Sequence, residues 1–345
     1  MQVTLKDVAR ESGYSITTVS RALAGYSDVN EITRQRIIEI ANNLGYQPNQ
    51  IARQLQSQRT NTIGMVIPTN PENAEDDFFT MLVKGVTHAA AHHHYDLLIS
   101  AQLPDDDEME AYRRIVGGNR VDGIILARTF QDDPRIAYLK QMNFPFAVSG
   151  RAAPHQVSNF PYIDADSQAG IHMLVSHFVA YGHKHIGLIL PPPDIAYTEY
   201  RHAGYKDGLA EAGLPYRTSY VTHGNLKRSG GRTRAHALLE ASPKLTAIIA
   251  CNDVMAFGVI SALGERGLTP GEDVAVGGFD DIPAAQHSIP SLTTVRQPIF
   301  EIGSRLAELL LTQISGEPPA EPASLLVPEL IVRASSGQPV SNQDQ

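Results

Sequence analysis

The sequence predicts a small all-α head followed by an α/β body of two lobes, and three observations lead to this prediction. Short helices, each ending at a glycine, fill the first sixty residues. From Asn61 onward, short apolar strands alternate with helix-length segments. The chain has 345 residues, which corresponds to two or three domains of about 150 residues each. One hydrophobic core does not usually extend over a body of this length, so we expect two lobes.

The composition excludes several classes of protein. Hydrophobic residues make up 42% of the chain and charged residues 19%, which is typical of folded domains rather than of disordered segments. The apolar runs are shorter than the roughly 18 residues of a transmembrane helix, and residues 1–7 lack the basic and apolar regions of a secretory signal. A lone cysteine, Cys251, forms no intrachain disulfide. We therefore expect a soluble protein of the cytoplasm with no membrane partner.

Each helix of the head has a predicted start and a predicted end. The starts are capping residues and the ends are glycines, in the pairs Thr4 and Gly13, Ser15 and Gly25, and Asn30 and Gly45. Asp7 adds an acidic residue to the first turn of the first helix. Two short helices joined by a tight glycine-containing turn and supported by a third form a helix-turn-helix unit, whose second helix enters the major groove of DNA.

The second helix carries side chains that suit this groove. Ile16 and Thr17 present methyl groups that can pack on thymine, and Arg21 can donate two hydrogen bonds to guanine. Hydroxyl groups instead suit phosphates, which position a protein without reading sequence. The hydroxyl-bearing candidates for contacts with DNA are Thr4, Ser15, Thr18, Ser20 and Tyr46. The alternative is a three-helix packing unit with no role in DNA binding.

The segment after the head predicts a short hinge helix. Pro48 and Asn49 are a good helix start, but residues 49–58 are too few to form a stable isolated helix in water. Two copies from a dimer, docked in a minor groove, would support one another, with Leu55 as an inserted apolar wedge and Asn49 as a further DNA contact. An ordinary interdomain linker is the alternative.

Charge also favours the head as the part that contacts nucleic acid. Residues 1–60 contain seven Lys and Arg against five Asp and Glu, whereas the whole chain has a net charge of −9. An acidic body repels polyanions, so contact with DNA should come from the mildly basic head.

The body predicts two parallel sheets covered by helices on both faces. Strands are expected at 63–67, 96–100, 123–127, 146–149, 186–190, 247–250 and 274–277. Helices are expected at 79–92, 109–116, 170–181, 203–212, 232–240 and 254–266. Ligands of such sheets bind beyond the carboxyl ends of the strands, so two lobes facing each other predict a cleft for a small molecule.

Polar residues that follow the predicted strands are candidates for the cleft. Carboxylates, an amide and guanidinium groups beside aromatic rings suit the hydroxyl edges and apolar faces of a sugar. The candidates for effector binding are Phe79, Arg128, Arg151, Tyr197, Arg201, Asn252, Asp253, Phe279, Asp280 and Gln297. For any one of them, a helix-capping or surface role is at least as common as contact with a ligand.

Several motifs resemble the LacI/GalR family of repressors along the whole chain. They are residues 3–9, 12–13, 18–23, 33–34, 44–49 and 52–55 in the head, and Arg201, Asn252-Asp253, residues 278–281 and residues 292–297 in the body. The resemblance implies a helix-turn-helix head and a body like a periplasmic binding protein. It also implies base contacts by Ile16, Thr17 and Arg21, a minor-groove wedge at Leu55, and effector contacts at the body motifs.

On this resemblance, we expect four segments. Residues 1–48 are the DNA-binding domain, 49–60 the hinge helix and linker, 61–340 the effector-binding and dimerisation domain, and 339–345 a tail. Within the body, the N-lobe is expected at about 61–162 and 293–322, and the C-lobe at about 163–292 and 323–338.

One departure from the family leaves the effector open. Many sugar-responsive relatives carry an acidic residue before the arginine that follows the fourth strand, whereas this chain has Ser149-Gly150-Arg151. A sugar remains the first expectation, and a nucleoside or sugar phosphate acting as corepressor is the alternative, because either phosphate or hydroxyl groups can use these arginines.

We therefore expect a transcriptional repressor that binds a palindromic double-stranded DNA operator as a homodimer or tetramer, with no catalytic residues, no metal and no cofactor. His88 and His92 are spaced for zinc on one helix face, but no glutamate completes a hydrolytic motif. The competing classes are a periplasmic sugar receptor, which would need an export signal, and an enzyme using Asp253 or Asp280 as a base, which would need a nucleophile or phosphate loop.

Overall fold

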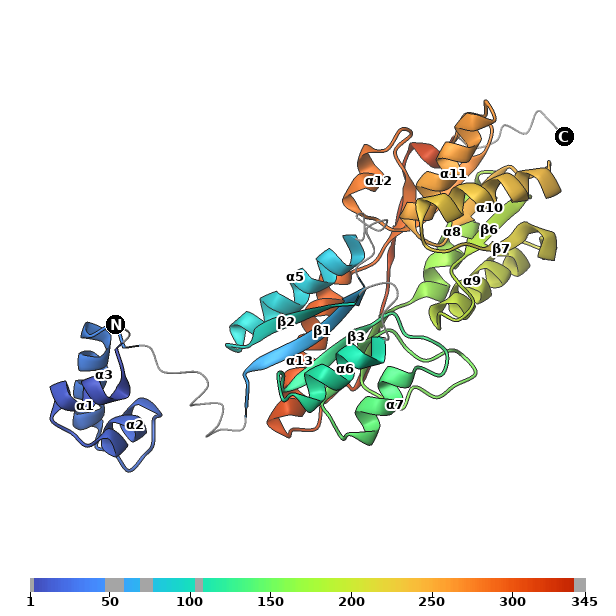
Figure 1. The fold of residues 1–345 in the computed structure, drawn as a ribbon. Helices are drawn as coiled ribbons and strands as arrows, with labels where there is room; N and C mark the ends of the chain where they lie inside the picture. Colours follow the sequence, from blue (N-terminus) through green and yellow to red (C-terminus); the bar gives the residue numbers. More distant parts are fainter. Residues whose placement is uncertain (1–2, 47–58, 69–76, 103–107, 338–345) are drawn as a thin grey trace. The chain divides into compact units, whose positions relative to one another are not determined.

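The computed structural model describes residues 3–46, 59–68, 77–102 and 108–337. The chain divides into two compact units, Met1–Thr60 and Asn61–Gln345, and each is described by itself (Figure 1).

The head consists of α1 (Leu5–Ser12), α2 (Ile16–Leu23) and α3 (Glu31–Asn43). The side chains of Val8, Val19 and Ile37 are fully buried between them and form the centre of a small core.

The predicted caps of the head helices are observed. The backbone N–H and the hydroxyl of Thr4 both donate to the Asp7 carboxylate, at 3.0 and 2.6 Å. The side chains of Ser15 and Asn30 accept from backbone N–H groups of Thr18 and Ile32, at 3.1 and 2.9 Å. The three predicted glycines end the helices with positive φ angles, at Gly13 (74°), Gly25 (79°) and Gly45 (67°).

The first sheet of the body has six strands in the order β11-β5-β4-β3-β1-β2, and every pair is parallel. Its strands are β1 (Thr62–Pro68), β2 (Asp96–Gln102), β3 (Gly123–Ala127), β4 (Phe146–Ser149), β5 (Tyr162–Ala165) and β11 (Ala323–Leu326). The helices α5 (Asp77–His92) and α13 (Ile299–Ser315) pack with Ile125 of β3 on one face. The helices α6 (Glu108–Gly117) and α7 (Pro134–Gln141) pack with Ile124 and Leu126 on the other face.

The second sheet has the order β12-β10-β9-β8-β6-β7, and only the β10–β12 pair among these described strands is antiparallel. Its strands are β6 (Ile186–Leu190), β7 (Val221–His223), β8 (Ala247–Ala250), β9 (Ala275–Asp280), β10 (Thr293–Arg296) and β12 (Glu329–Ile331). The helices of this lobe are α8 (Ser167–Ala180), α9 (Tyr197–Glu211), α10 (Arg228–Ala241), α11 (Asp253–Glu265) and α12 (Pro283–His287). Strands and helices share one continuous apolar core.

The chain passes between the two sheets after β5, after β10 and after β11, as the strand orders require (Figure 1). The lobe boundaries expected from the sequence therefore need correction. Residues 163–165 and 323–326 belong to the first sheet, and residues 293–296 to the second. The expected boundaries are off by a few residues because these crossover strands are short and partly polar, so their sequence does not show which sheet pairs with them.

Candidate functional site

The predicted base-reading side chains lie on the exposed face of α2. Ile16 is 45% exposed although it is a large apolar residue, and Thr17 and Arg21 are also exposed. Val19 and Ala22 on the opposite face are buried in the core of the head. An exposed isoleucine beside a threonine and an arginine is a surface that can contact thymine and guanine edges.

Three of the hydroxyl-bearing residues of the head make hydrogen bonds within the head itself. The hydroxyl of Thr4 donates to Asp7, and the Ser15 hydroxyl lies 2.8 Å from that of Thr18 besides accepting its N–H. Ser20 and Tyr46 are half-buried. Thr4 and Ser15 are therefore the N-cap residues of α1 and α2, and Thr18 is hydrogen-bonded to Ser15.

Two further predicted DNA contacts, Asn49 and Leu55, lie outside the described residues, as does the whole predicted hinge helix at residues 49–58.

A cavity of about 270 Å³ lies between the two lobes of the body, at the carboxyl ends of their strands. Six of the residues predicted for effector binding line it: Arg128, Tyr197, Arg201, Asn252, Asp280 and Gln297. Residues from both sheets thus meet in one cleft, as the topology predicts.

Arg201 has the most enclosed guanidinium group of this cavity. It is 3% exposed and lies between two rings, with its Cζ atom 4.4 Å from the centre of the Tyr197 ring and 3.9 Å from that of Phe279. Its Nη1 donates to the carbonyl oxygen of Cys251, while its Nε finds no hydrogen-bond partner among the described residues. A buried donor without a partner costs free energy, so this group suits a ligand that supplies an acceptor.

Three of the other predicted residues do not line the cavity but lie behind its wall. Phe279 is fully buried beneath Arg201, and Phe79 is 5% exposed with the Arg128 guanidinium 4.8 Å from its ring centre. Asp253 is fully buried and accepts from the Ile282 N–H at 2.9 Å and from the Thr294 hydroxyl at 2.5 Å. We correct these assignments: Phe79, Asp253 and Phe279 support the lining residues, because each is enclosed by its own neighbours.

The pKa of Asp253 follows from this burial. Desolvation raises its pKa to about 8, and the nearby charge of Asp280 adds to the rise, while the hydrogen bond from Thr294 opposes it.

Arg151, another predicted effector-binding residue, does not line the cavity either. Its guanidinium lies over the Tyr200 ring at 3.7 Å and pairs with Asp164 at 3.3 Å. Asp164 itself lines the cavity, and burial raises its pKa to about 6 against the opposing charge of Arg151. A carboxylate therefore does pair with Arg151 at the cavity, and it comes from β5, a position that sequence order did not reveal.

Strained backbone marks two of the cleft residues. Asp280 has a φ of 122° and Arg128 a φ of 58°, both unusual for side chains other than glycine. The carboxylate of Asp280 accepts from the Gln297 amide at 2.6 Å. Residues held in such conformations at strand ends are commonly found at binding sites.

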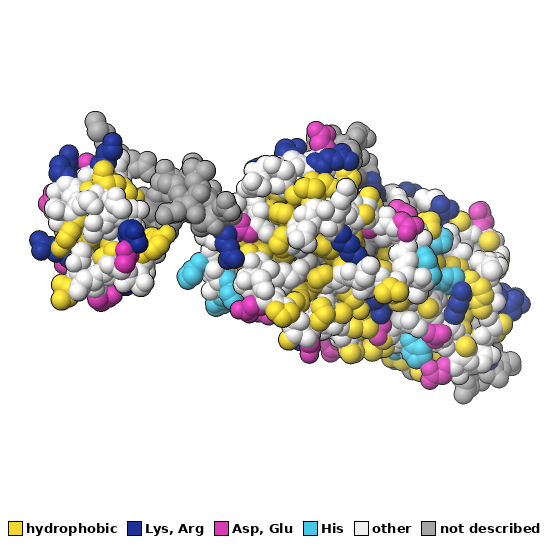
Figure 2. All heavy atoms as spheres, turned by 90° about the horizontal axis from the view of Figure 1, so that it is seen from below, with side chains coloured by type: hydrophobic (Ala, Val, Ile, Leu, Met, Phe, Trp, Pro, Cys, Tyr) yellow, Lys and Arg dark blue, Asp and Glu magenta, His cyan; other side chains and the backbone are white. Residues whose placement is uncertain are grey.

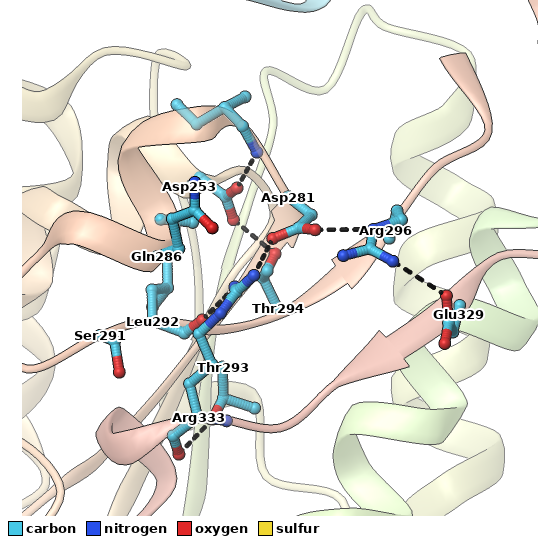
Figure 3. Close-up of polar contacts among 12 residues, drawn as sticks. Asp253, Asp281, Gln286, Ser291, Leu292, Thr293, Thr294, Arg296, Glu329 and Arg333 are labelled. Atoms are coloured by element: carbon cyan, nitrogen blue, oxygen red, sulfur yellow. Dashed lines mark hydrogen bonds and ion pairs between the residues drawn. The ribbon is translucent and has the colours of Figure 1, made fainter. Parts of the chain in front are cut away.

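An ion-pair cluster is centred on Asp281, the residue that follows Asp280 in the chain (Figure 3). The Asp281 carboxylate pairs with Arg296 and with Arg333, both at 2.7 Å, and Arg296 also pairs with Glu329 at 3.2 Å. Arg296 ends β10 and Glu329 begins β12, so the cluster ties together two of the segments that cross between the lobes.

The lobes also meet at a second place, on the loop that follows β3. The Gln131 N–H donates to the Asp194 carbonyl at 2.8 Å, and the Ala196 N–H donates to the Thr129 carbonyl at 3.0 Å. The Gln131 amide also donates to Glu199 at 3.0 Å. These contacts hold the lobes together in the arrangement seen here.

Sequence reasoning missed several residues of the cavity. The additional lining residues are Asp77, Phe78, Ser149, Gly150, Asp164, Ser167, Leu226, Arg228, Val254, Ile282 and Ile302. Ser149 ends β4 and Gly150 follows it, so the strand-end rule could have found both. Ile302 comes from α13, far along the chain, and no local signal places it there.

Three further properties of the described residues bear on function. Figure 2 shows basic and acidic side chains interspersed over the visible face of the body, which is typical of a solvated surface. In the described part of the chain, no helix has the length and apolar character needed to cross a membrane. Within those same residues, no three His, Cys, Asp or Glu side chains are grouped to hold a metal ion.

Comparisons with known proteins match both units. Residues 4–49 match the model for bacterial regulatory proteins of the lacI family, and residues 175–336 match a periplasmic binding protein-like domain. The fold class inferred from the sequence is thereby confirmed.

Full-length relatives share the same organisation. The transcriptional regulator AglR of Rhizobium meliloti is 32% identical over 341 residues, which cover 98% of this chain and 95% of AglR. The repressor CytR of Escherichia coli is 30% identical, covering 96% of each chain.

Solved structures agree along nearly the whole chain. The Lac repressor dimer bound to operator and the anti-inducer ONPF has a TM-score of 0.83 at 26% identity, covering 98% of this chain and 100% of that one. The complex of the regulator CelR with cellobiose has a TM-score of 0.76 at 29% identity, covering 97% and 100%.

Proposed function

This chain belongs to the LacI family of bacterial regulatory proteins, and from that premise we propose that it is a repressor whose DNA binding is controlled by a small effector in the interlobe cavity. Proteins of this family are transcriptional regulators and not enzymes, which confirms the prediction that the chain is no enzyme. A DNA-binding regulator of a bacterium must reach the chromosome, so we place its action in the cytoplasm.

Ile16, Thr17 and Arg21 read base edges in the major groove in this proposal. A dimer presents two heads related by a two-fold axis, so its operator is palindromic. The hinge between head and body contributes Leu55 as a minor-groove wedge and Asn49 as a further contact. Dimers and tetramers both satisfy this symmetry.

The effector is a neutral sugar in this proposal. The cavity lining contains three arginines, Arg128, Arg201 and Arg228, and three carboxylates, Asp77, Asp164 and Asp280. Balanced charges with two amides suit a ligand that both donates and accepts hydrogen bonds, as sugar hydroxyls do. The buried Nε of Arg201 is the single observation that most supports a ligand in this cleft.

A nucleoside or sugar phosphate is the second candidate. Three guanidinium groups can pair with a phosphate, but three carboxylates at the same cavity oppose a dianion. Protonation of Asp164 would favour this candidate, and burial already raises the pKa of Asp164 to about 6.

The cleft and the hinge communicate through the lobes. An effector that bridges Arg201 and Asp280 on one lobe to Arg128 and Asp164 on the other favours one lobe arrangement. The ion-pair cluster of Asp281, Arg296, Arg333 and Glu329 couples this change in lobe arrangement to the crossover segments. A coupling of roughly 1–3 kcal/mol, several-fold to over a hundredfold in DNA affinity, is typical of such linkage.

Two measurements on the full-length protein test the proposal. At near-physiological salt it should bind duplexes from its own promoter more tightly than scrambled duplexes of the same length, and equal binding would contradict a sequence-reading function. A thermal-shift screen should then find a neutral sugar, because a ligand at 100 times its dissociation constant adds about 2.7 kcal/mol to stability. Stabilisation by sugar phosphates alone would favour the second candidate.

A further inference from the structure

Arg21 does not extend freely from the reading helix in this structure. Its Nε donates to Asp28 Oδ1 at 3.2 Å, and its Nη2 lies 2.6 Å from Asp28 Oδ2. The same guanidinium lies 5.1 Å from the centre of the Tyr26 ring. A carboxylate thus holds one edge of the guanidinium, and an aromatic ring lies against its face.

The turn that carries Asp28 is itself fixed. The Arg34 Nη2 donates to the carbonyl oxygens of Tyr26 and Val29, at 2.7 and 3.3 Å, on either side of Asp28. The Tyr26 N–H donates to the Arg21 carbonyl at 3.1 Å, and Val29 is buried in the core of the head. Asp28 is therefore presented to Arg21 from a braced turn and not from a loose loop.

The pairing leaves the other edge of the guanidinium available. A guanidinium offers two parallel N–H bonds at its Nε/Nη2 edge and two more at its Nη1/Nη2 edge. Asp28 uses the first edge, and no described residue accepts a hydrogen bond from Nη1. The free edge is the one that can bond O6 and N7 of guanine together.

We propose that Asp28 is a specificity-determining positioning residue, which aims the free edge of Arg21 at a base in the major groove. This inference rests on the proposed role of Arg21 in reading bases. A long arginine side chain loses rotamer freedom on binding, and a side chain already held in place loses less. Both members of the pair are about half exposed, at 47% and 51%, so such a pair contributes little to folding.

Asp28 also acts on the protein's affinity for DNA in general. Its negative charge lies beside a surface that meets phosphates, so it weakens binding to every sequence. Replacing it by asparagine is expected to raise affinity for random duplexes while lowering discrimination, two changes in opposite directions.

The test selects preferred duplexes from a randomised pool with the full-length protein and then measures binding to each base variant of the selected site. Arg21→Ala identifies the base pair that Arg21 reads, with a roughly ten-fold loss of discrimination there. Asp28→Asn should lose at least about three-fold at the same base pair only, and Asp28→Glu, which keeps the carboxylate, should retain most of it. Glu39→Gln removes one exposed negative charge from α3 and is the matched control, expected to leave the preference unchanged.

The outcomes distinguish failure of the proposed role of Asp28 from failure of the proposed repressor function. If Asp28→Asn keeps full discrimination, or changes affinity equally on all sequences as Glu39→Gln does, Asp28 does not aim Arg21. If Arg21→Ala itself leaves the sequence preference unchanged, Arg21 does not read a base, and the proposed role of Asp28 is wrong as well. If no sequence is enriched by the wild-type protein, the proposed repressor function fails.

Discussion

The reading face of the head and the cavity of the body are built in opposite ways. Ile16, Thr17 and Arg21 come from one helix of eight residues and lie on its exposed side. The cavity residues come from strand ends and helices of two lobes, and Arg201 among them is 3% exposed. The head therefore exposes its proposed contact groups on a surface, whereas the body gathers its own around an interlobe cavity.

This difference has an energetic side. Exposed polar groups on a short helix remain hydrated, so they cost little folding free energy. The helix itself depends on its caps and on a few buried side chains. Buried ionisable groups cost much more, and the body compensates with stacked rings around the charged Arg201, while Asp253 accepts two hydrogen bonds and has its pKa raised by burial. Substitutions in the body should accordingly have larger effects than those in the head.

The largest effect is expected for Arg201→Ala. Removing this buried guanidinium from the proposed effector site should lower effector affinity roughly 100-fold, since truncation of a buried charged partner costs about 2–5 kcal/mol. Calorimetry with the sugar found in the screen measures this loss. Arg234→Ala on the exposed side of α10 is the control and should bind normally; undiminished binding by Arg201→Ala would remove Arg201 from the site.

The next largest effect is expected in the pH dependence of folding stability, which Asp253→Asn should change. Folded Asp253 keeps its proton to about pH 8, whereas the unfolded chain releases it near 3.8. Between these values the unfolded state binds fewer protons, so this group makes the wild type less stable as pH rises, by up to about 1.4 kcal/mol per pH unit.

The asparagine variant cannot titrate and should lack that part of the decline. Urea unfolding of the body at pH 5 and pH 8 compares the two proteins. Parallel pH dependence in wild type and variant would show that Asp253 is ionised in the fold.

A smaller effect is expected in the head for Arg21→Ala. Loss of one bidentate contact with guanine should cost about 1–3 kcal/mol of binding to the preferred operator and relax the preference at one base pair. Competition binding against single-base variants measures it. An equal loss on every sequence would mean that Arg21 contacts phosphate.

The smallest effect is expected for Ser15→Ala. The substitution removes the acceptor for the Thr18 N–H and should lower the stability of the head by about 1 kcal/mol. Thr17→Ala, an exposed position with no capping role, should leave stability unchanged while weakening DNA discrimination. Urea unfolding followed by circular dichroism on the full-length chain compares them, and equal stability of both variants would contradict the cap.

The head shows how far local signals reach. Thr4, Ser15 and Asn30 cap the helices as predicted, and three glycines end them, because capping and left-handed turns depend on neighbours a few residues away. The strand-end rule likewise placed Arg128, Asn252 and Asp280 in the cavity.

The predictions from sequence were wrong where contacts join segments that are far apart in the chain. Asp164 lines the cavity although no local pattern predicted it, and Phe279 and Asp253 lie behind the cavity wall instead of in it. The lobe membership of β5, β10 and β11 depends on pairing between strands far apart in the chain.

By itself, the sequence determined the helix-turn-helix head, the alternating body and the family, because periodicity, caps and motifs act over short stretches of chain. Only the tertiary structure decided which side chains face the cavity, that burial raises the pKa of Asp253 and Asp164, and that Asp28 holds Arg21. Each of these depends on burial or on a distance between groups that folding alone brings together, and no local pattern in the chain encodes either.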